Sequence, residues 1–278
     1  MTKSIRKRGL PPGWYPDTRE AIQTFVEEQR QKNPPSFSCG AVVVPHAGWY
    51  FSGSLALHGL ELLSKECKTL VVIGGHLSSR DTPRIMSRDG VETPLGVLPV
   101  DGEFTQKIQQ LISWVEDEEV DNTVEVQLPM IHYLFPAVQI VWLRLPPSLE
   151  SYRIGKTIAR IARELGYPCG VVGSTDLTHY GPNYGFVPQG VGKAALGWVK
   201  EVNDKMLLDA IQRRDPEEIL KRAHQDYSAC SIGAVLGTLG FADEAGYTRV
   251  HLIEYATSAD RYPSHSFVGY GVVGFSSP

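Results

Sequence analysis

Several features that are scarce in this sequence exclude whole classes of protein. No apolar run approaches the roughly 18 residues that a membrane span needs. Basic residues form no cluster beyond the short run at 6–8, and the net charge is −4. Because phosphate binding needs clustered Lys and Arg, a nucleic-acid partner is not expected. The motif Gly-x-Ser-x-Gly is absent as well, which argues against a serine α/β-hydrolase.

Cysteine is also scarce, and the spacing of the cysteines indicates whether the protein works in an oxidising or a reducing compartment of the cell. The four cysteines are Cys39, Cys67, Cys169 and Cys230, and they form no Cys-x-x-Cys pair. This spacing favours neither a disulfide framework nor a structural zinc site. The basic first residues are not followed by an apolar stretch, so no secretory signal is expected. A reducing cytoplasm and no membrane association are therefore the expectation.

Short β-branched runs alternate with amphipathic stretches along the chain. Buried strands are expected at Ala41–Val44, 70–73, 138–143 and 170–173. Helices are expected between them: to about residue 30 after a cap at Asp17 or Thr18, at 54–65, at 103–114 after Asp101, from a cap at Ser151 to Gly166, and after Asp215.

This alternation predicts an α/β fold with a mainly parallel central sheet flanked by helices on both faces. One domain is expected over residues 1–278. Residues 1–13 are expected to be a flexible N-terminus and residues 32–38 a surface loop. The segment 251–275 is rich in strand residues and glycine, and it is expected to add edge strands.

Three segments of the chain share one plan. In each, a buried strand ends, small residues turn the chain and a histidine follows, giving His46, His76 and His179. Ligands of open α/β sheets bind beyond the carboxyl ends of the strands, so these histidines are expected to face one crevice. Histidine suits two tasks there, metal binding and proton transfer near neutral pH. Two such histidines with an acidic or thiolate ligand would build a mononuclear metal site.

The other polar residues near these histidines are open to more than one interpretation. Asp176 precedes His179 by three residues, where it either orients the imidazole or caps a local turn. His58 and His132 lie on expected helices and are interpreted as packed or exposed side chains. His265 lies near the glycine-rich tail and is a weaker candidate for the rim of a pocket.

At this point several motifs together resemble one family. They are Trp-Tyr-Pro at 14–16, Pro-His-Ala-Gly-Trp-Tyr-Phe-Ser-Gly at 45–53, Gly-His at 75–76, Val-Glu-Val-Gln-Leu-Pro at 124–129 and Ser-Thr-Asp-Leu-Thr-His-Tyr at 174–180. In this order they resemble the Memo family, whose bacterial and archaeal members are also called AmmeMemoRadiSam system protein B. The resemblance covers roughly residues 14–275. It implies a fold similar to that of class III (LigB-type) extradiol dioxygenases, which use iron(II) held by two histidines and a carboxylate.

The resemblance also implies roles for single residues. His46 and His76 match the two histidine ligands, and His179 matches the acid/base histidine with Asp176 beside it. Glu125 matches a pocket glutamate, although a helix-start carboxylate is an equal interpretation. The chain departs from the family at Asn122, where a histidine is usual.

The third metal ligand stays open. The usual Cys-Gly-x-x-Pro-Ile motif is replaced by Asp-Tyr-Ser-Ala-Cys-Ser-Ile-Gly at 226–233. A gapless alignment sets Tyr227 at the family's cysteine with Asp226 next to it, whereas a three-residue deletion sets Cys230 there. Cys230 is preferred because it precedes an expected buried helix, as the family's cysteine does. Asp226 would instead restore the two-histidine, one-carboxylate set of iron(II) enzymes.

The function expected from this resemblance is that of an iron(II) protein acting on a small phenolic or enolic molecule, with zinc or copper as alternative metals. Expected partners are the substrate and other AmmeMemoRadiSam proteins, including a radical-SAM protein. One rival function is a non-catalytic metal-binding or peptide-binding module that uses the same pocket. A second rival is a thiol hydrolase with Cys230 as nucleophile and His179 as base.

Overall fold

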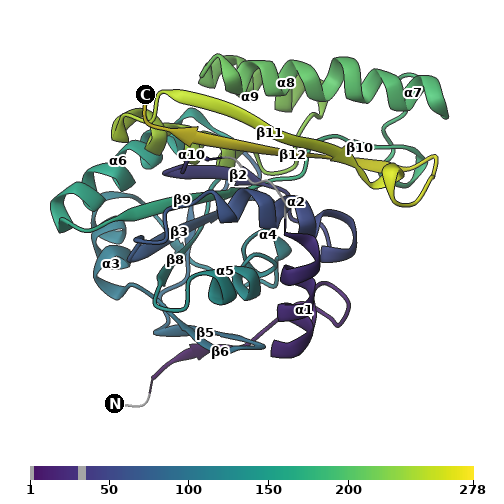
Figure 1. Ribbon diagram of the computed structural model, residues 1–278. Helices are drawn as coiled ribbons and strands as arrows, with labels where there is room; N and C mark the ends of the chain where they lie inside the picture. The colour runs from purple at the N-terminus through teal and green to yellow at the C-terminus, as the bar shows by residue number, and fades with distance from the viewer. Residues whose placement is uncertain (1–2, 31–35) are drawn as a thin grey trace.

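The computed structural model describes residues 3–30 and 36–278, and a mixed β-sheet runs through its centre (Figure 1). The strand order is β10-β12-β2-β9-β3-β8-β4-β7, and β11 pairs with β12 as well. Four adjacent central strands are parallel: β2 (Ala41–Val44), β9 (Cys169–Ser174), β3 (Thr69–Gly74) and β8 (Gln139–Arg144). They are almost wholly buried, as expected for continuous β-branched runs covered on both faces.

The outer strands make the sheet mixed. Those of the main sheet are β4 (Arg84–Ile85), β7 (Val115–Glu116), β10 (His179–Tyr180), β11 (Arg249–Thr257) and β12 (Phe267–Ser276). The tail forms strands as predicted, but β12 is not at an edge: it pairs antiparallel with β2 on one side and with β10 and β11 on the other. Because β12 has partner strands on both sides, every one of its residues is buried, unlike the residues of a strand at an open edge.

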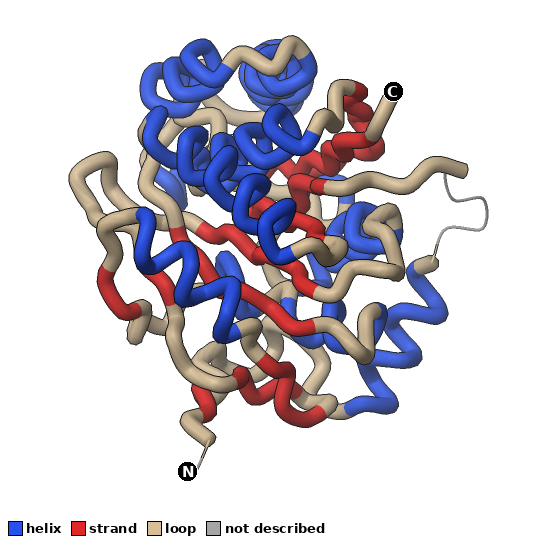
Figure 2. The backbone as a smooth tube through the Cα atoms, turned by 90° about the vertical axis from the view of Figure 1, so that its left-hand side faces the viewer, coloured by secondary structure: helices blue, strands red, loops and turns tan. Residues whose placement is uncertain are grey.

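Helices cover both faces of the main sheet, and Figure 2 shows the strands running between them. One face carries α3 (Gly102–Leu111), α6 (Leu149–Leu165) and α10 (Ile232–Ala245). The other carries α1 (Arg19–Gln29), α2 (Trp49–Glu61), α4 (Asn122–Glu125) and α5 (Leu128–Leu134). Of the remaining helices, α8 (Asp204–Gln212) packs against β11 and α9 (Pro216–Asp226) packs against α10, while η2 (Val199–Asn203) joins α7 (Lys193–Trp198) to α8. The short helix η1 (Pro182–Tyr184) contacts β10, and η3 (Ser258–Asp260) contacts β12.

The strand residues alternate between two hydrophobic cores. Val42 and Val72 belong to the core under α2, whereas Val43, Val71 and Ile73 belong to the core under α6 and α10. This is the period of two that a pleated strand imposes. The central α/β architecture predicted from the sequence is therefore confirmed.

Two helix starts differ from the prediction. The second helix begins at Trp49 rather than at 54, because the Trp49 N–H donates to the carbonyl of Trp14 (2.8 Å) and the aromatic run at 49–51 is helical. Helix α6 begins after Ser148, and the Ser151 hydroxyl donates to the Pro146 carbonyl (2.5 Å) from inside the first turn. Gly166 ends that helix in the left-handed conformation, as predicted.

The N-terminal segment, which is expected from the sequence to be flexible, contains a short strand. Strand β1 (Ile5–Arg6) pairs with β5 (Gly90–Thr93), which pairs with β6 (Gly96–Pro99) in a small separate sheet. The Arg6 guanidinium donates to the carbonyls of Asp117 and Glu119. These long-range contacts are invisible to a local reading of the sequence. In the predicted surface loop at 32–38, residues 32–35 lie outside the described part of the chain.

Candidate metal centre

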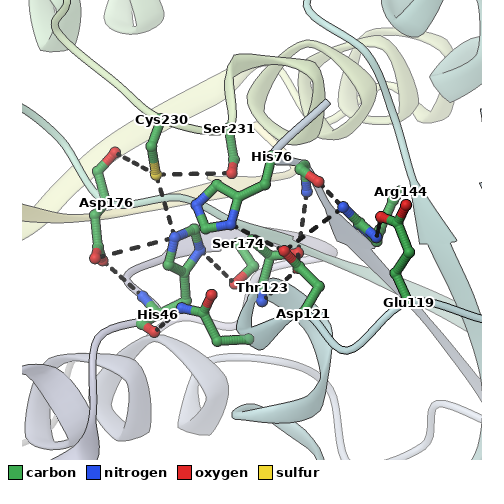
Figure 3. Close-up of polar contacts among 12 residues, drawn as sticks. His46, His76, Glu119, Asp121, Thr123, Arg144, Ser174, Asp176, Cys230 and Ser231 are labelled. Atoms are coloured by element: carbon green, nitrogen blue, oxygen red, sulfur yellow. Dashed lines mark hydrogen bonds and ion pairs between the residues drawn. The ribbon is translucent and has the colours of Figure 1, made fainter. Parts of the chain in front are cut away.

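Three loops that follow adjacent strands of the sheet, at the carboxyl ends of these strands, bring predicted residues together (Figure 3). His46 follows β2 and His76 follows β3, while Asp176 follows β9, the strand that lies between them. Cys230 approaches from the loop before α10. Its N–H donates to the Asp176 carbonyl (3.3 Å), and the Ser231 N–H donates to the Thr175 hydroxyl (3.1 Å). The cysteine loop is therefore tied to the loop that carries Asp176.

The close approach of the cysteine loop requires a glycine before His76. A Cβ atom built on Gly75 would lie 2.5 Å from the Cβ of Ser231, a distance that real Cβ atoms do not show. Gly75 is thus what allows Cys230 to reach the two histidines.

His46, His76 and Cys230 each offer one ligand atom, and these atoms all lie within 4.8 Å of one another. Sγ of Cys230 is 3.2 Å from Nε2 of His46. A tetrahedral ion with a metal–sulfur bond of ~2.3 Å and a metal–nitrogen bond of ~2.0 Å separates two such ligand atoms by about 3.5 Å. The donor set and its spacing therefore fit a single transition-metal ion.

Hydrogen bonds hold His46 with Nε2 toward the cysteine. Its Nδ1 lies 3.3 Å from Oγ of Ser174, which accepts a further hydrogen bond from Nε2 of Gln127 (3.1 Å). Oδ1 of Asp176 accepts from the backbone N–H of His46 (2.8 Å). His46 is 1% exposed, so its ring orientation is fixed from several sides.

His76 is held by a different residue. Its Nδ1 lies 2.9 Å from Oδ2 of Asp121, which leaves Nε2 as the nitrogen free for a metal. His76 has a φ of 56°, in the left-handed region that non-glycine residues rarely adopt. Its side chain is 33% exposed, so this part of the centre is open to a ligand.

The charges of the centre are coupled. Burial raises the pKa of the Cys230 thiol, but the neighbouring imidazoles of His46 and His76 outweigh burial and hold that pKa well below its ordinary value. Burial lowers the pKa of His76, but its hydrogen bonds to Asp121 and Cys230 outweigh burial and raise that pKa to about 10. The thiolate form that binds metals is thus favoured in place, and without an ion it is balanced by protonated imidazole.

The centre opens into a cavity of about 740 Å³. Trp14, Tyr50, Phe51, Tyr184 and Tyr262 contribute aromatic surface to its lining, and His179 and Asp176 face it together with the two candidate ligand histidines. The His179 ring packs edge-on against Tyr184 with centroids 5.0 Å apart. The cavity therefore combines apolar walls with a few polar groups, as small-molecule sites do.

Asp176 contacts a different histidine from the one that its place in the sequence indicated. Its carboxylate binds the backbone of His46, and its Oδ2 lies 4.0 Å from Nε2 of that residue. Within residues 3–30 and 36–278, no hydrogen bond or ion pair joins Asp176 to His179. Burial raises the pKa of Asp176, and His46 lowers it in part.

Two other candidates lie away from the centre. Glu125 accepts hydrogen bonds from the N–H groups of Gly9 and Leu10 and from the hydroxyl of Tyr15 (2.9 Å). It does not line the cavity; it lies in the first turn of α4, as the helix-start interpretation expected, and anchors the N-terminal segment there. Asp226 lies outside the ligand cluster at the end of α9, where it pairs with Arg222 (3.1 Å).

Asn122 and three further histidines have surroundings that the structure defines. Asn122 lines the cavity and donates to the His46 carbonyl (2.9 Å). His58 lies beside Glu254 (2.5 Å), and His132 beside the Thr93 hydroxyl (2.8 Å), so both are packed on helices as expected. His265 is exposed and is not part of the cavity lining, although Ser264 and Ser266 are.

Sequence reasoning missed Asp121, Ser174 and Gln127. Asp121 and Ser174 contact histidines that are 45 or more positions away in the sequence, and Gln127 acts on His46 through the Ser174 hydroxyl. Spacing along the chain therefore does not predict these contacts. Asp121 and Gln127 flank the Val-Glu segment that was noted at 124–125. Gln127 and Ser174 also stand in the motifs at 124–129 and 174–180, which were the signal available for these two residues.

The chain is similar to known proteins along most of its length. The model of the Memo-like protein family matches residues 6–273. A MEMO1 family protein of Methanococcoides burtonii is 32% identical, with 83% of this chain and 84% of the relative covered. A MEMO1 family protein of Pyrococcus furiosus is 29% identical over 97% of this chain and 98% of the relative.

Among solved structures, an uncharacterized protein from Escherichia coli K12 is similar in fold. Its TM-score is 0.55 and its identity 14%, and the match covers 83% of this chain and 98% of that protein. At this identity the likeness concerns the fold alone. The family match and the archaeal relatives, taken with the motifs around His46 and His179, show that this chain belongs to the Memo-like protein family.

Proposed function

We propose that this protein is a metal-dependent oxidoreductase with non-haem iron(II), related to the extradiol dioxygenases and acting on a small phenolic or enolic substrate. The observation that carries the proposal is the cluster of His46, His76 and Cys230, whose two histidines line an aromatic-walled cavity. Two imidazoles and one thiolate hold an ion while leaving coordination positions open. When bound, iron(II) would supply the redox chemistry that no side chain provides.

The residues around the centre have separate roles in this proposal. His179 faces the cavity without being one of the clustered ligand atoms, so it is free to accept a proton from a substrate hydroxyl. Asp176 holds the backbone of His46 and thereby keeps that imidazole in place. The aromatic walls orient a planar substrate and exclude water from it. Such positioning and general-base help each lower the barrier without changing the metal.

A thiol hydrolase is the second candidate, and one observation favours it. The pKa of the Cys230 thiol lies well below its ordinary value although burial raises it, because His46 and His76 stabilise the thiolate. An activated thiolate next to an imidazole is the arrangement of thiol nucleophiles. In this structure the base would be His46, at 3.2 Å, rather than His179.

Oxygen uptake distinguishes the two candidates. Protein purified without oxygen and loaded with iron(II) is mixed with catechols of different ring substitution, and dioxygen consumption is followed with an electrode. The proposal expects stoichiometric uptake that metal removal abolishes and that the Cys230→Ser variant impairs. Hydrolysis of a thioester or activated ester by metal-free protein, with no oxygen uptake by the loaded protein, would instead support the thiol hydrolase.

A further inference from the structure

Arg144 is a buried cation that sequence reasoning passed over. It is the last residue of β8, next to Gly74 of β3 in the parallel register, and its side chain is 2% exposed. Its Nη1 lies 3.1 Å from Asp117 and 3.2 Å from Glu119, and its Nη2 lies 3.5 Å from Asp121. Removing a charge from water is costly unless it is paired, and these three carboxylates supply the pairing.

Two contacts of Arg144 converge on His76 (Figure 3). Nε donates to the carbonyl of Gly75 (2.9 Å), and that carbonyl belongs to the peptide that joins Gly75 to His76. Nη2 lies beside Oδ2 of Asp121, the atom that contacts Nδ1 of His76 (2.9 Å). One guanidinium therefore contacts the backbone before His76 and the carboxylate that holds its ring.

The backbone of His76 needs such support. Its φ of 56° is disfavoured for a residue with a Cβ atom and persists only when neighbours fix it. The preceding peptide, between Gly74 and Gly75, is held as well, because the Gly75 N–H donates to Oγ1 of Thr123 (3.1 Å). Thr123 in turn donates through its own N–H to Asp121 (2.9 Å). Asp121 and Arg144 thus belong to one network around the strained residue.

We propose that Arg144 is a positioning residue of the metal centre: through the Gly75 carbonyl and through Asp121 it fixes the backbone and the ring of His76, so that Nε2 points at the ion. The inference rests on the proposed metal site. A lysine cannot replace the guanidinium, since a point charge with three donors cannot reach the Gly75 carbonyl and the carboxylates in a fixed fork.

The chain offers a matched control for the charge of Arg144. Arg84 pairs with the same Glu119 (2.7 Å), but within the part of the chain that the structure describes no hydrogen bond or ion pair joins it to Asp121 or Gly75. Replacing Arg84 therefore removes a cation from the same acidic cluster without touching the proposed path to His76. The test uses the full chain in four variants, Arg144→Lys, Arg144→Met, Asp121→Asn and Arg84→Met, with near-UV circular dichroism to confirm the fold.

The first readout is titration with cobalt(II), whose visible and charge-transfer bands report imidazole and thiolate ligands. Loss of a residue that orients a ligand typically weakens metal binding by about 10- to 100-fold. That weakening, with altered bands, is expected in Arg144→Lys and Asp121→Asn, and Arg84→Met is expected to stay within about threefold of wild type. Wild-type affinity and bands in folded Arg144→Lys would overturn the inference, whether or not Arg144→Met folds.

The second readout needs no metal. In protein labelled with ¹⁵N-histidine, the Nδ1–H signal of His76, assigned with His76→Gln, reports the hydrogen bond to Asp121. A shift of that signal in metal-free Arg144→Lys, but not in Arg84→Met, is expected. An unchanged signal would overturn the inference. Failure of wild-type protein to bind cobalt(II) while this signal shifts would count against the proposed function and leave the positioning role of Arg144 supported.

Discussion

Sγ of Cys230 lies 3.2 Å from Nε2 of His46, although 184 residues separate the two in the sequence. This contact, together with the position of Asp226 outside the cluster, supports Cys230 as the candidate third ligand. We predict that Cys230→Ser weakens iron(II) or cobalt(II) binding by at least about 10-fold, because a hydroxyl is a far poorer ligand than a thiolate. Metal titration, together with loss of the sulfur charge-transfer band, checks this.

Asp226→Asn is the matched control for that experiment. Its carboxylate pairs with Arg222 at the end of α9, outside the ligand cluster, so metal affinity is expected to stay unchanged. If Cys230→Ser leaves both affinity and spectrum intact while Asp226→Asn strips the metal, the carboxylate is the ligand and the preferred alignment is wrong.

A second prediction concerns His179. It faces the cavity but is not one of the clustered ligand atoms, so His179→Ala is expected to bind metal with wild-type affinity. General acid–base help is typically worth about 10² to 10⁴ in rate, and any turnover of a catechol should fall by that factor. Metal content and oxygen uptake are measured on the same preparation.

His265→Ala provides the comparison, because His265 is exposed and does not line the cavity. It should retain both metal and turnover. A folded His179→Ala protein that is isolated without metal would mean that His179 is a ligand and not a base.

Metal affinity should depend on pH. A ligand imidazole must be neutral, whereas the hydrogen bonds to Asp121 and Cys230 outweigh burial and raise the pKa of His76 to about 10 in the metal-free protein. An ion therefore displaces a proton at neutral pH. Affinity is expected to rise by about 10-fold per pH unit between pH 7 and 9, for each proton displaced. Cobalt(II) titrations at three pH values measure the slope, and a flat profile would contradict the coupling.

A fourth prediction concerns Asp204, which lies under the loop of His179. It accepts hydrogen bonds from the Thr178 N–H (3.1 Å) and from the Tyr255 hydroxyl (2.7 Å). Burial raises its pKa from 3.8 to about 6, and these hydrogen bonds offset part of the increase. The folded state thus holds this proton more tightly than the unfolded state, so the contribution to stability is full below pH 3.8 and is lost as the pH rises through 6.

The consequence can be measured by urea unfolding at pH 5 and pH 7. The Asp204 carboxyl should make the protein about 1 kcal/mol less stable at pH 7 than at pH 5, on top of other titrating groups. Asp204→Asn, which keeps the shape but not the charge, should remove that part of the difference. An identical pH dependence in the variant and in wild type would show that Asp204 titrates alike in both states.

Much of the fold could be predicted because it depends on local pattern. The β-branched runs at Ala41–Val44 and 70–73 form strands wherever they can be buried, and Gly166 ends α6 through its own φ. The start of α2 could not be predicted in the same way. It depends on the contact between Trp49 and the carbonyl of Trp14, and such contacts leave no periodic signal.

In the candidate site, too, local sequence pattern predicts some features and long-range contacts determine others. The plan of a strand followed by a histidine correctly brought His46 and His76 together, because the carboxyl ends of parallel strands share one edge. The partner of Asp176 could not be inferred from its distance to His179 along the chain. Strand β9 lies beside β2 in the sheet, so Asp176 is closer to His46 than sequence spacing indicates.

We propose that His46 and His76 hold a metal ion, and the metal content of the purified protein measures this. Wild type, His46→Ala, His76→Ala and the exposed-histidine control His224→Ala are purified without oxygen, reconstituted with iron(II), desalted and measured by elemental analysis. About one iron per chain is expected in wild type and His224→Ala, and almost none in the other two variants, because the ligands bind as a preorganised set. Full stoichiometric iron in both His46→Ala and His76→Ala would contradict it.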